Sequence, residues 1–135
     1  MADNQIIIDA DGAIFGRLCS FAAKKVLEGS EVIIVNSEKS IITGNKKNII
    51  GEYGELSKKG GHSLKGPKYS KIPHKILKRG IRGMLPDFRR GIGKQAFKRI
   101  KCYDDLPEEF KNKKTINMKE KKLKYITVEE ISRLI

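Results

Sequence analysis

The chain has 135 residues, of which 39% are hydrophobic, and this is enough for a single domain over residues 1–135 with a hydrophobic core. It carries 29 Lys and Arg against 16 Asp and Glu, and the formal net charge of +13 predicts a polyanionic partner. No apolar run approaches the roughly 18 residues of a membrane span, and the N-terminus lacks the layout of a signal peptide. We therefore expect a cytoplasmic protein with no membrane partner.

The first part of the chain predicts a βαβ unit. Residues 6–8 form a short apolar run that is typical of a buried strand. An amphipathic helix should follow, because apolar residues recur at i, i+3, i+4, i+7 and i+8, and Gly29 suits its left-handed end. The apolar stripe consists of Cys19, Ala22, Ala23, Val26 and Leu27. Residues 31–36 are β-branched and mostly apolar, so this strand should be covered on both faces and run parallel to the first.

A second helix is expected to complete a nearly neutral core over about residues 5–56. Residues 41–44 predict a brief extended segment. Asn45 is suited to cap a helix that continues to Leu56. The side chains expected on its inner side are Ile49, Ile50 and Tyr53.

The positive charge is concentrated in residues 58–101. This stretch holds fifteen basic residues and one acid, Asp87, whereas the rest of the chain has 14 basic residues against 15 acidic ones. The segment 57–67 is basic, rich in glycine and without periodicity, so we expect a loop that becomes ordered with its partner. We predict that residues 58–101 form the RNA-binding part of the chain, a loop followed by two basic helices.

The first basic helix is expected to begin at Pro73, which suits a helix N-terminus, and the segment should end at Pro86. The cations that share one face are Lys75, Lys78, Arg79 and Arg82. The apolar residues on the opposite face are Leu77, Ile81, Met84 and Leu85. Like charges on one helix face repel each other, and here no acid compensates them. A bound phosphate backbone is therefore the expected partner of this face.

A second basic helix is expected after the elbow formed by Arg89 and Arg90. Its predicted apolar seam is Ile92, Ala96, Phe97 and Ile100. The cations along its flank are Lys94, Lys98 and Lys101. Residues 101–103 can then return as a strand, which would bring the chain back to the sheet.

Two glycines stand inside the first basic helix. Each interior glycine costs a helix about 1 kcal/mol relative to alanine, so Gly80 and Gly83 need a reason. They flank Arg82, and we interpret them as sites of close approach by another backbone, from RNA or from a neighbouring helix. The alternative is that the helix ends near Gly80 and that a loop follows.

Residues from about 115 to 135 predict a C-terminal strand and helix. Thr127 is placed to cap the helix, and Glu130 at its third position completes a capping box. Ile131 and Leu134 should face inward.

The type of nucleic acid follows from the motifs that the sequence lacks. It has no helix-turn-helix spacing, zinc finger or basic zipper, which argues against sequence-specific DNA binding. It also lacks an RNP-type aromatic strand, and its aromatic content is only 7%. Recognition of shape and phosphates remains, and this favours structured RNA.

Catalytic and metal sites are not predicted. The loop from Gly12 to Gly16 resembles a phosphate loop only in outline, because it lacks the third glycine of a dinucleotide fingerprint and the Gly-Lys-Ser/Thr of a P-loop. Arg17 beside it could hold an anion such as an RNA phosphate. Asp9 and Asp11 are explained by turn formation. We expect no enzyme activity, no catalytic residue, no cofactor and no small-molecule substrate.

The cysteines and histidines give no sign of a reactive or metal centre. Cys19 and Cys102 have no second Cys or His at metal-ligand spacing and are predicted to be small buried side chains. His62 and His74 lie in the basic stretch, where we expect polar surface or RNA-contacting residues.

Several short segments resemble a known family. Residues 9–10 and 16–18, Asp-Ala and Gly-Arg-Leu, are similar to the opening of ribosomal protein L-thirteen, and residues 35–38, Val-Asn-Ser-Glu, to its Val-Asn-Ala-Glu. The most specific similarity is at residues 79–86, Arg-Gly-Ile-Arg-Gly-Met-Leu-Pro, which resemble the family's Arg-x-Val-Arg-Gly-Met-Leu-Pro. The ending at residues 125–131 resembles the archaeal and eukaryotic branch.

The resemblance implies a three-layer α/β/α fold with a mainly parallel four-stranded sheet, to which the basic helical extension is added. It also implies a structural protein of the large ribosomal subunit, bound to rRNA and to neighbouring ribosomal proteins and acting early in assembly. The alternatives are a free-standing RNA- or DNA-binding regulator and an enzyme with a phosphate ligand. The predicted RNA-binding residues are Arg17, Lys58, Lys59, His62, Lys65, Lys68, Lys71, Lys75, Lys78, Arg79, Arg82, Arg89, Arg90, Lys94, Lys98 and Arg99.

Overall fold

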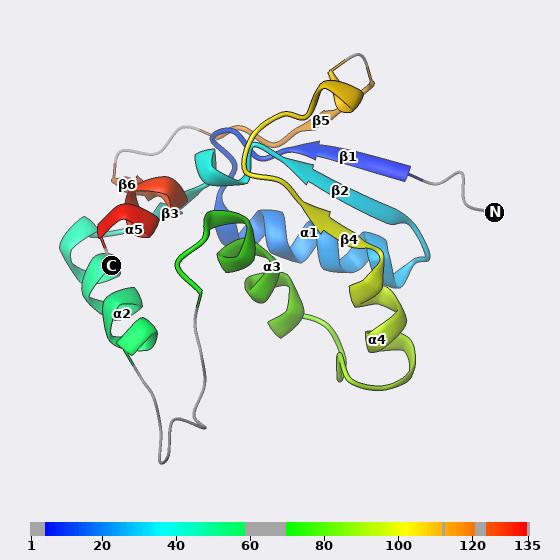
Figure 1. Ribbon diagram of the computed structural model, residues 1–135, viewed down its shortest axis with the longest axis horizontal. Helices are drawn as coiled ribbons and strands as arrows, with labels where there is room; N and C mark the ends of the chain where they lie inside the picture. The colour runs from blue at the N-terminus through cyan, green and yellow to red at the C-terminus, as the bar shows by residue number, and fades with distance from the viewer. Residues whose placement is uncertain (1–4, 59–69, 112, 121–123, 135) are drawn as a thin grey trace.

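The computed structural model describes residues 5–58, 70–111, 113–120 and 124–134 (Figure 1). Its strands are β1 (Gln5–Asp9), β2 (Glu31–Val35), β3 (Ile41–Thr43), β4 (Ile100–Cys102), β5 (Ile116–Asn117) and β6 (Tyr125–Thr127). Its helices are α1 (Phe15–Leu27), α2 (Lys46–Lys58), α3 (Pro73–Gly83), α4 (Gly91–Lys98) and α5 (Val128–Leu134). Most of the predicted basic loop, residues 59–67, lies outside the described residues.

The main sheet has four parallel strands in the order β4-β2-β1-β5. Its central pair, β1 and β2, places Ile7 opposite Ile33 and is joined by α1, which confirms the predicted βαβ unit. A separate antiparallel pair is formed by β3 and β6, with Ile42 opposite Ile126. The predicted α/β fold with a mainly parallel four-stranded sheet is confirmed, and the core carries the basic helices at its side (Figure 1).

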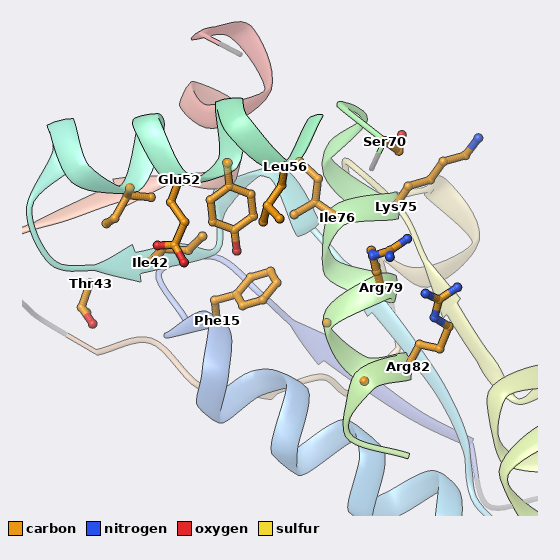
Figure 2. Close-up of a pocket in the computed structure, with 14 residues that line it drawn as sticks. Phe15, Ile42, Thr43, Glu52, Leu56, Ser70, Lys75, Ile76, Arg79 and Arg82 are labelled. Atoms are coloured by element: carbon orange, nitrogen blue, oxygen red, sulfur yellow. The ribbon is translucent and has the colours of Figure 1, made fainter. Parts of the chain in front are cut away.

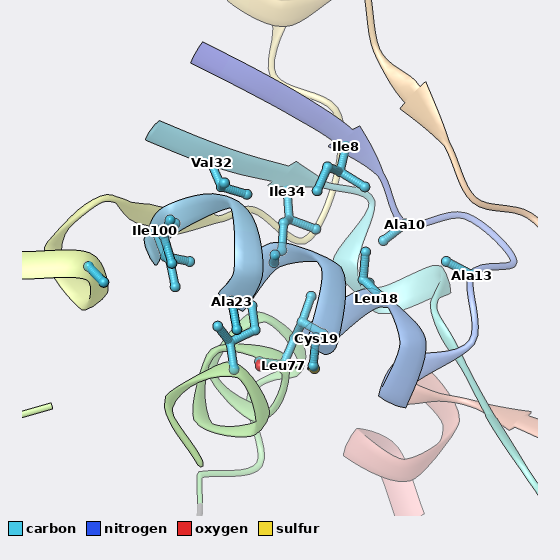
Figure 3. Close-up of a cluster of buried hydrophobic side chains, with 14 residues drawn as sticks. Ile8, Ala10, Ala13, Leu18, Cys19, Ala23, Val32, Ile34, Leu77 and Ile100 are labelled. Carbon is cyan, nitrogen blue, oxygen red and sulfur yellow. Dashed lines mark hydrogen bonds between the residues drawn. The ribbon is translucent and has the colours of Figure 1, made fainter. Parts of the chain in front are cut away.

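The two faces of the sheet are covered differently. On one face α1 packs against the strands and α3 packs against α1, so that Ile8, Leu18, Ile34 and Leu77 share one buried cluster (Figure 3). On the other face Ile7, Ile33 and Val35 are covered by the segment around the 3-10 turn Glu108–Phe110, chiefly by the ring of Phe110. Burial on both faces explains why β2 is almost entirely apolar.

The turn after β1 shows what Asp9 does. Its Oδ1 accepts hydrogen bonds from the backbone N–H of Asp11 and from Nδ2 of Asn36, each at 3.0 Å. Asn36 itself adopts a left-handed conformation with φ of 57°. The carboxylate therefore joins the ends of the two central strands, and the turn-forming interpretation of Asp9 and Asp11 is confirmed.

The predicted apolar stripe and C-terminal end of α1 are confirmed except for one side chain. Cys19, Ala22, Ala23 and Val26 are buried, and Gly29 has the left-handed φ of 104° that the helix end requires. Leu27 was expected on the same stripe, but it is 39% exposed. The buried stripe therefore ends at Val26, one residue before the last residue of the helix.

Three other apolar residues expected to face inward are exposed, and each lies at or next to one of the two ends of its helix. They are Met84, Ile92 and Leu134, which are 47%, 68% and 57% exposed. Helical periodicity assigns a face to a residue, but it does not say whether another element covers that face.

The second basic helix is shorter than predicted. Ile100 and Lys101 were placed on α4, yet both belong to β4, which pairs with β2 through Val32 and Ile100. Ile100 is fully buried there, so parallel pairing with the sheet outweighs the helical spacing of the segment. The predicted strand return at Lys101 is confirmed.

The predicted cap of α2 is present, and so is the Thr127 half of the capping box predicted for α5. Oδ1 of Asn45 accepts a hydrogen bond from the backbone N–H of Lys47 at 3.0 Å, and Oγ1 of Thr127 accepts one from the N–H of Glu130 at 3.2 Å. The carboxylate of Glu130 also pairs with Nζ of Lys46 at 2.7 Å, which joins the two helices. The side chains packed between them include Ile49, Ile50, Tyr53, Ile126 and Ile131.

Candidate nucleic-acid interface

The N-terminus of α3 is fixed by a residue that sequence reasoning missed. The backbone N–H of His74 donates to Oδ1 of Asp104 at 2.9 Å, and its ring Nδ1 lies 3.1 Å from Oδ2 of the same carboxylate. Asp104 thus satisfies one of the N–H groups that a helix start leaves open, which is the role of a cap. No local motif signals it, because Asp104 comes 30 residues later in the chain.

The inner face of α3 attaches the basic helix to the core. Leu77 and Ile81 are fully buried and Ile76 nearly so. Each fully buried side chain of this kind contributes about 1.5–3 kcal/mol. The helix continues through Gly80 to Gly83, so the alternative in which it ends near Gly80 is wrong.

The question of the two glycines has a different answer at each position. A Cβ added at Gly80 would lie 2.8 Å from the ring of Phe15 and 3.1 Å from Sγ of Cys19, so the close neighbour is a side chain of α1. A Cβ added at Gly83 would meet nothing within 4 Å. Gly80 is therefore required by the packing of α3 on α1, whereas Gly83 leaves open space at the end of the helix.

The outer face of α3 carries the predicted cations. Lys75 is exposed, while Lys78, Arg79 and Arg82 are half-buried. The Nζ of Lys78 lies 5.0 Å from the ring centroid of Phe97, and the guanidinium of Arg82 lies 4.4 Å from that of Phe88. An aromatic ring orients such a cation but does not neutralise it. The positive electrostatic potential of these side chains therefore extends to the surface.

These aromatic supports could not be read from the sequence. Phe88 lies in the elbow and Phe97 in α4, and the two rings meet edge to face with centroids 5.9 Å apart. Arg89 also lies over the ring of Phe88, at 5.1 Å. The rings therefore join three elements into one support for the cations, and only the tertiary fold brings them together.

The elbow is the connection between α3 and α4, residues 84–90, and it contains Asp87, the one acid of the basic stretch. Oδ1 of Asp87 accepts from the N–H of Arg89 at 3.1 Å, and its Oδ2 lies 3.5 Å from Nε of Arg90. Gly91 follows with a left-handed φ of 54°. A Cβ at Gly93 would collide with the backbone carbonyls of Asp87 and its neighbour, so the turn depends on these glycines.

The remaining predicted residues divide into three groups. Lys58, Lys71, Arg89, Arg90, Lys94 and Lys98 are exposed. Two arginines make contacts within the protein: Nη1 of Arg99 donates to the carbonyl of Val26 at 2.8 Å, and Nη1 of Arg17 pairs with Glu120 at 2.5 Å. Lys59, His62, Lys65 and Lys68 lie outside the described residues.

Of the two cysteines predicted to be buried, Cys19 is buried and Cys102 is only partly buried. Burial raises the pKa of the Cys102 thiol to about 12, and Asp104 adds to the rise while Lys78 opposes it. Burial also raises the pKa of Cys19, with a further contribution from Cys102. Both thiols are protonated at neutral pH and are poor nucleophiles.

Comparison with known proteins decides the family. The model of the family described as Ribosomal protein L13 matches residues 3–109 of this chain. The chain belongs to this family. A relative from Methanocaldococcus jannaschii, named large ribosomal subunit protein uL13, is 45% identical over 130 residues, which cover 94% of both chains. Proteins of the same name from Methanosarcina barkeri and Archaeoglobus fulgidus are 42% and 35% identical, covering 94% and 100% of this chain and 94% and 90% of theirs.

Membership of the L13 family confirms the resemblance drawn from residues 79–86, which lie inside the matched range. These residues form the end of α3 and the start of the elbow. The archaeal relatives agree with the branch that the C-terminal segment indicated. The chain is thus a ribosomal protein, and its family is structural rather than catalytic.

Other kinds of site find little support in this L13 family member. Among the residues that the structure describes, no three or more His, Cys, Asp or Glu side chains are grouped so that they could hold a metal ion. Within the same described residues, no helix is both long and apolar enough to span a membrane. The candidate site is formed by the cationic outer faces of α3 and α4.

Proposed function

We propose that this chain is a structural component of the large ribosomal subunit that binds rRNA through the basic face of α3, the elbow and α4. The observation that carries the proposal is the position of the charge. Fifteen cations fall in residues 58–101, and the described ones on α3 are held on the outer face by a buried inner face. The relatives' name, large ribosomal subunit protein, supports the same partner.

Phosphates are the groups that this face is suited to bind. The guanidinium group of an arginine can donate two parallel hydrogen bonds to the oxygens of one phosphate. Lys75, Arg79 and Arg82 follow one another along α3 at intervals of about one helical turn. The exposed cations of the elbow and α4, including Arg90 and Lys94, extend the same positive surface. Such contacts recognise the shape of folded RNA more than its sequence.

Two of the predicted residues contribute less to the proposed rRNA contact. The guanidinium of Arg99 already serves the fold through Val26, so we assign it chiefly to stability. Arg17 keeps a place in the interface, because its side chain is 61% exposed and an exposed ion pair with Glu120 is worth only about 0–1 kcal/mol. The basic residues that precede α3 in the sequence, including Lys59 and Lys65, are also proposed to contact rRNA.

Sedimentation of a cell lysate tests the function. We expect the chain to migrate with the large ribosomal subunit of the cytoplasm and to stay with it through a moderate-salt wash. A free pool of the chain with no ribosomal fraction would contradict the proposal and would favour a free-standing regulator.

Depletion of the chain tests the proposed role in assembly. We expect large-subunit precursors that sediment more slowly than the mature particle and that accumulate as the chain is withdrawn. A normal subunit profile after complete depletion would show that the chain is dispensable for assembly.

A further inference from the structure

A second concentration of positive charge lies outside residues 58–101. Residues 111–124 contain seven lysines and one acid, Glu120, whose carboxylate pairs with Arg17. Without these two stretches, the rest of the chain has seven basic residues against fourteen acidic ones. The positive charge is therefore divided between two segments, and the remainder of the chain is negative.

The two basic segments lie at opposite edges of the main sheet. In the order β4-β2-β1-β5, α3 and α4 lie beside β4, whereas residues 111–119 include β5 at the other edge. Figure 1 shows α3 and α4 on one side of the sheet and β5, with the turn Glu108–Phe110, on the other. Figure 2 shows Lys75 and Arg82 projecting from α3 on the side away from Phe15. The sheet therefore separates the two sets of cations.

Four lysines around β5 form what we call the β5 cluster, and all four are exposed: Lys111, Lys113, Lys114 and Lys119. The Nζ of Lys113 lies 5.4 Å from the ring centroid of Phe110, the residue that covers the second face of the sheet. The stem of Lys119 packs on the backbone of Gly12, because a Cβ added there would lie 2.7 Å from its Cγ. The fold thus fixes the bases of these side chains and leaves their charges at the surface.

The charges of the β5 cluster are not balanced within the described part of the chain. Glu108 and Glu109 precede the cluster and are exposed. Among the residues that the structure describes, however, no carboxylate forms an ion pair with any of the four lysines. An external anion can therefore reach them without displacing an internal partner.

Two other roles for these lysines fit less well. Lysines beside an edge strand can prevent pairing with other strands, but β5 has only two residues and offers little edge to protect. Interfaces between proteins are depleted in lysine. The phosphates of a nucleic acid, in contrast, attract lysine as a point charge without requiring a particular side-chain geometry.

We propose that the β5 cluster binds a second segment of rRNA, separate from the one on α3 and α4, so that the chain holds two rRNA segments together. A single strand that joined the two surfaces would have to cross the acidic remainder of the chain, which repels phosphates. The inference rests on the proposed function and adds a contact that the basic face of α3 does not include. Such lysine contacts position the RNA without reading its sequence.

A triple variant tests the second contact: Lys111→Gln, Lys113→Gln, Lys114→Gln. Glutamine removes the charge and keeps much of the length of the side chain. The matched control replaces three exposed cations outside both basic segments: Lys24→Gln, Lys47→Gln, Arg133→Gln. Circular dichroism and urea unfolding of the full-length variants establish that they fold.

The probe is the organism's own large-subunit rRNA, transcribed in vitro and bound to the full chain. We expect the slope of log K against log salt to fall by roughly 0.7–0.9 per lysine in the triple variant, with little change in the control. Hydroxyl-radical footprinting should show two separate protected segments with the wild type. The triple variant should lose one of them and keep the other, and Arg79→Ala with Arg82→Ala should weaken the segment that the triple variant keeps.

An unchanged slope and footprint in the triple variant, or an equal loss in the control, would overturn the second contact. An intact rRNA footprint together with a lost crosslink to another ribosomal protein in assembled subunits would overturn it in favour of a protein partner. A single protected segment with the wild type, lost only in the arginine variant, would refute the second contact and leave the proposed function standing. Absence of salt-dependent rRNA binding by the wild type would refute the proposed function itself.

Discussion

The two helices α1 and α3 pack against each other, and their cations make different contacts. On α1, Arg17 pairs with Glu120, and Lys25 pairs with Glu28 at 3.5 Å. Lys25 also lies over the ring of Phe21 in its own helix, whereas on α3 Lys78 and Arg82 lie over Phe97 and Phe88, which belong to α4 and the elbow. The comparison therefore separates α3, whose cations are tied by aromatic rings to the elbow and α4, from α1, whose ion pairs reach Glu28 and Glu120.

Within α3 a second division runs between its two faces. The inner face attaches the helix to α1 through Leu77 and Ile81, and the outer face carries the cations. If this division is correct, substitutions on the inner face should change stability, and those on the outer face should change RNA binding.

The largest expected effect is that of Ile81→Ala. Ile81 is fully buried, and truncation of such a side chain leaves a cavity that lowers the free energy of unfolding by about 2–5 kcal/mol. Lys75→Ala, on the exposed face of the same helix, should change it by less than about 0.5 kcal/mol. Urea unfolding followed by circular dichroism measures both. Equal losses would show that α3 is not divided into two faces.

Arg99→Ala should follow in size, and it separates the two kinds of arginine. The hydrogen bond from Nη1 of Arg99 to the carbonyl of Val26 involves a charged donor, so its loss should lower the free energy of unfolding by about 1.5–3 kcal/mol. Lys98→Ala, one residue earlier and exposed, serves as the control and should be nearly neutral. If Arg99→Ala leaves stability unchanged but weakens rRNA binding, Arg99 belongs with the outer face after all.

Gly80→Ala is expected to lower the free energy of unfolding by about 1–3 kcal/mol. The new methyl group would lie 2.8 Å from the ring of Phe15, so α3 or the ring must shift. Gly83→Ala adds the same methyl group in open space and should raise the free energy of unfolding by up to about 1 kcal/mol through helix propensity. Thermal unfolding of the pair checks this, and the same sign for both variants would contradict the packing described for Gly80.

The fold could be predicted as far as local pattern determines it. The βαβ unit, the caps Asn45 and Thr127 and the left-handed Gly29 depend on periodicity and on near neighbours in the chain. The exposure of residues such as Leu27 could not be predicted, because it depends on which elements cover a helix end. The transfer of Ile100 to β4 depends in the same way on pairing with a distant strand.

The candidate site shows the same limit. The cationic spacing of α3 was visible in the sequence, and so was the elbow that identifies the family. The contacts that hold the face were not, because Asp104, Phe88 and Phe97 reach α3 from other elements. The internal partners of Arg17 and Arg99 were equally hidden, since Glu120 and Val26 are 103 and 73 residues away in sequence.

The salt dependence of rRNA binding tests the central claim most directly. The measurement compares the wild type with the double variant Arg79→Ala, Arg82→Ala and with the control Lys24→Ala, Lys47→Ala, which removes two exposed cations from outside the basic stretch. If each arginine contacts a phosphate, the slope of log K against log salt should fall by roughly 0.7–0.9 per residue in the first variant, with little change in the control. An unchanged slope in the arginine variant, or an equal decrease in both, would contradict the account of α3 as the helix that binds rRNA.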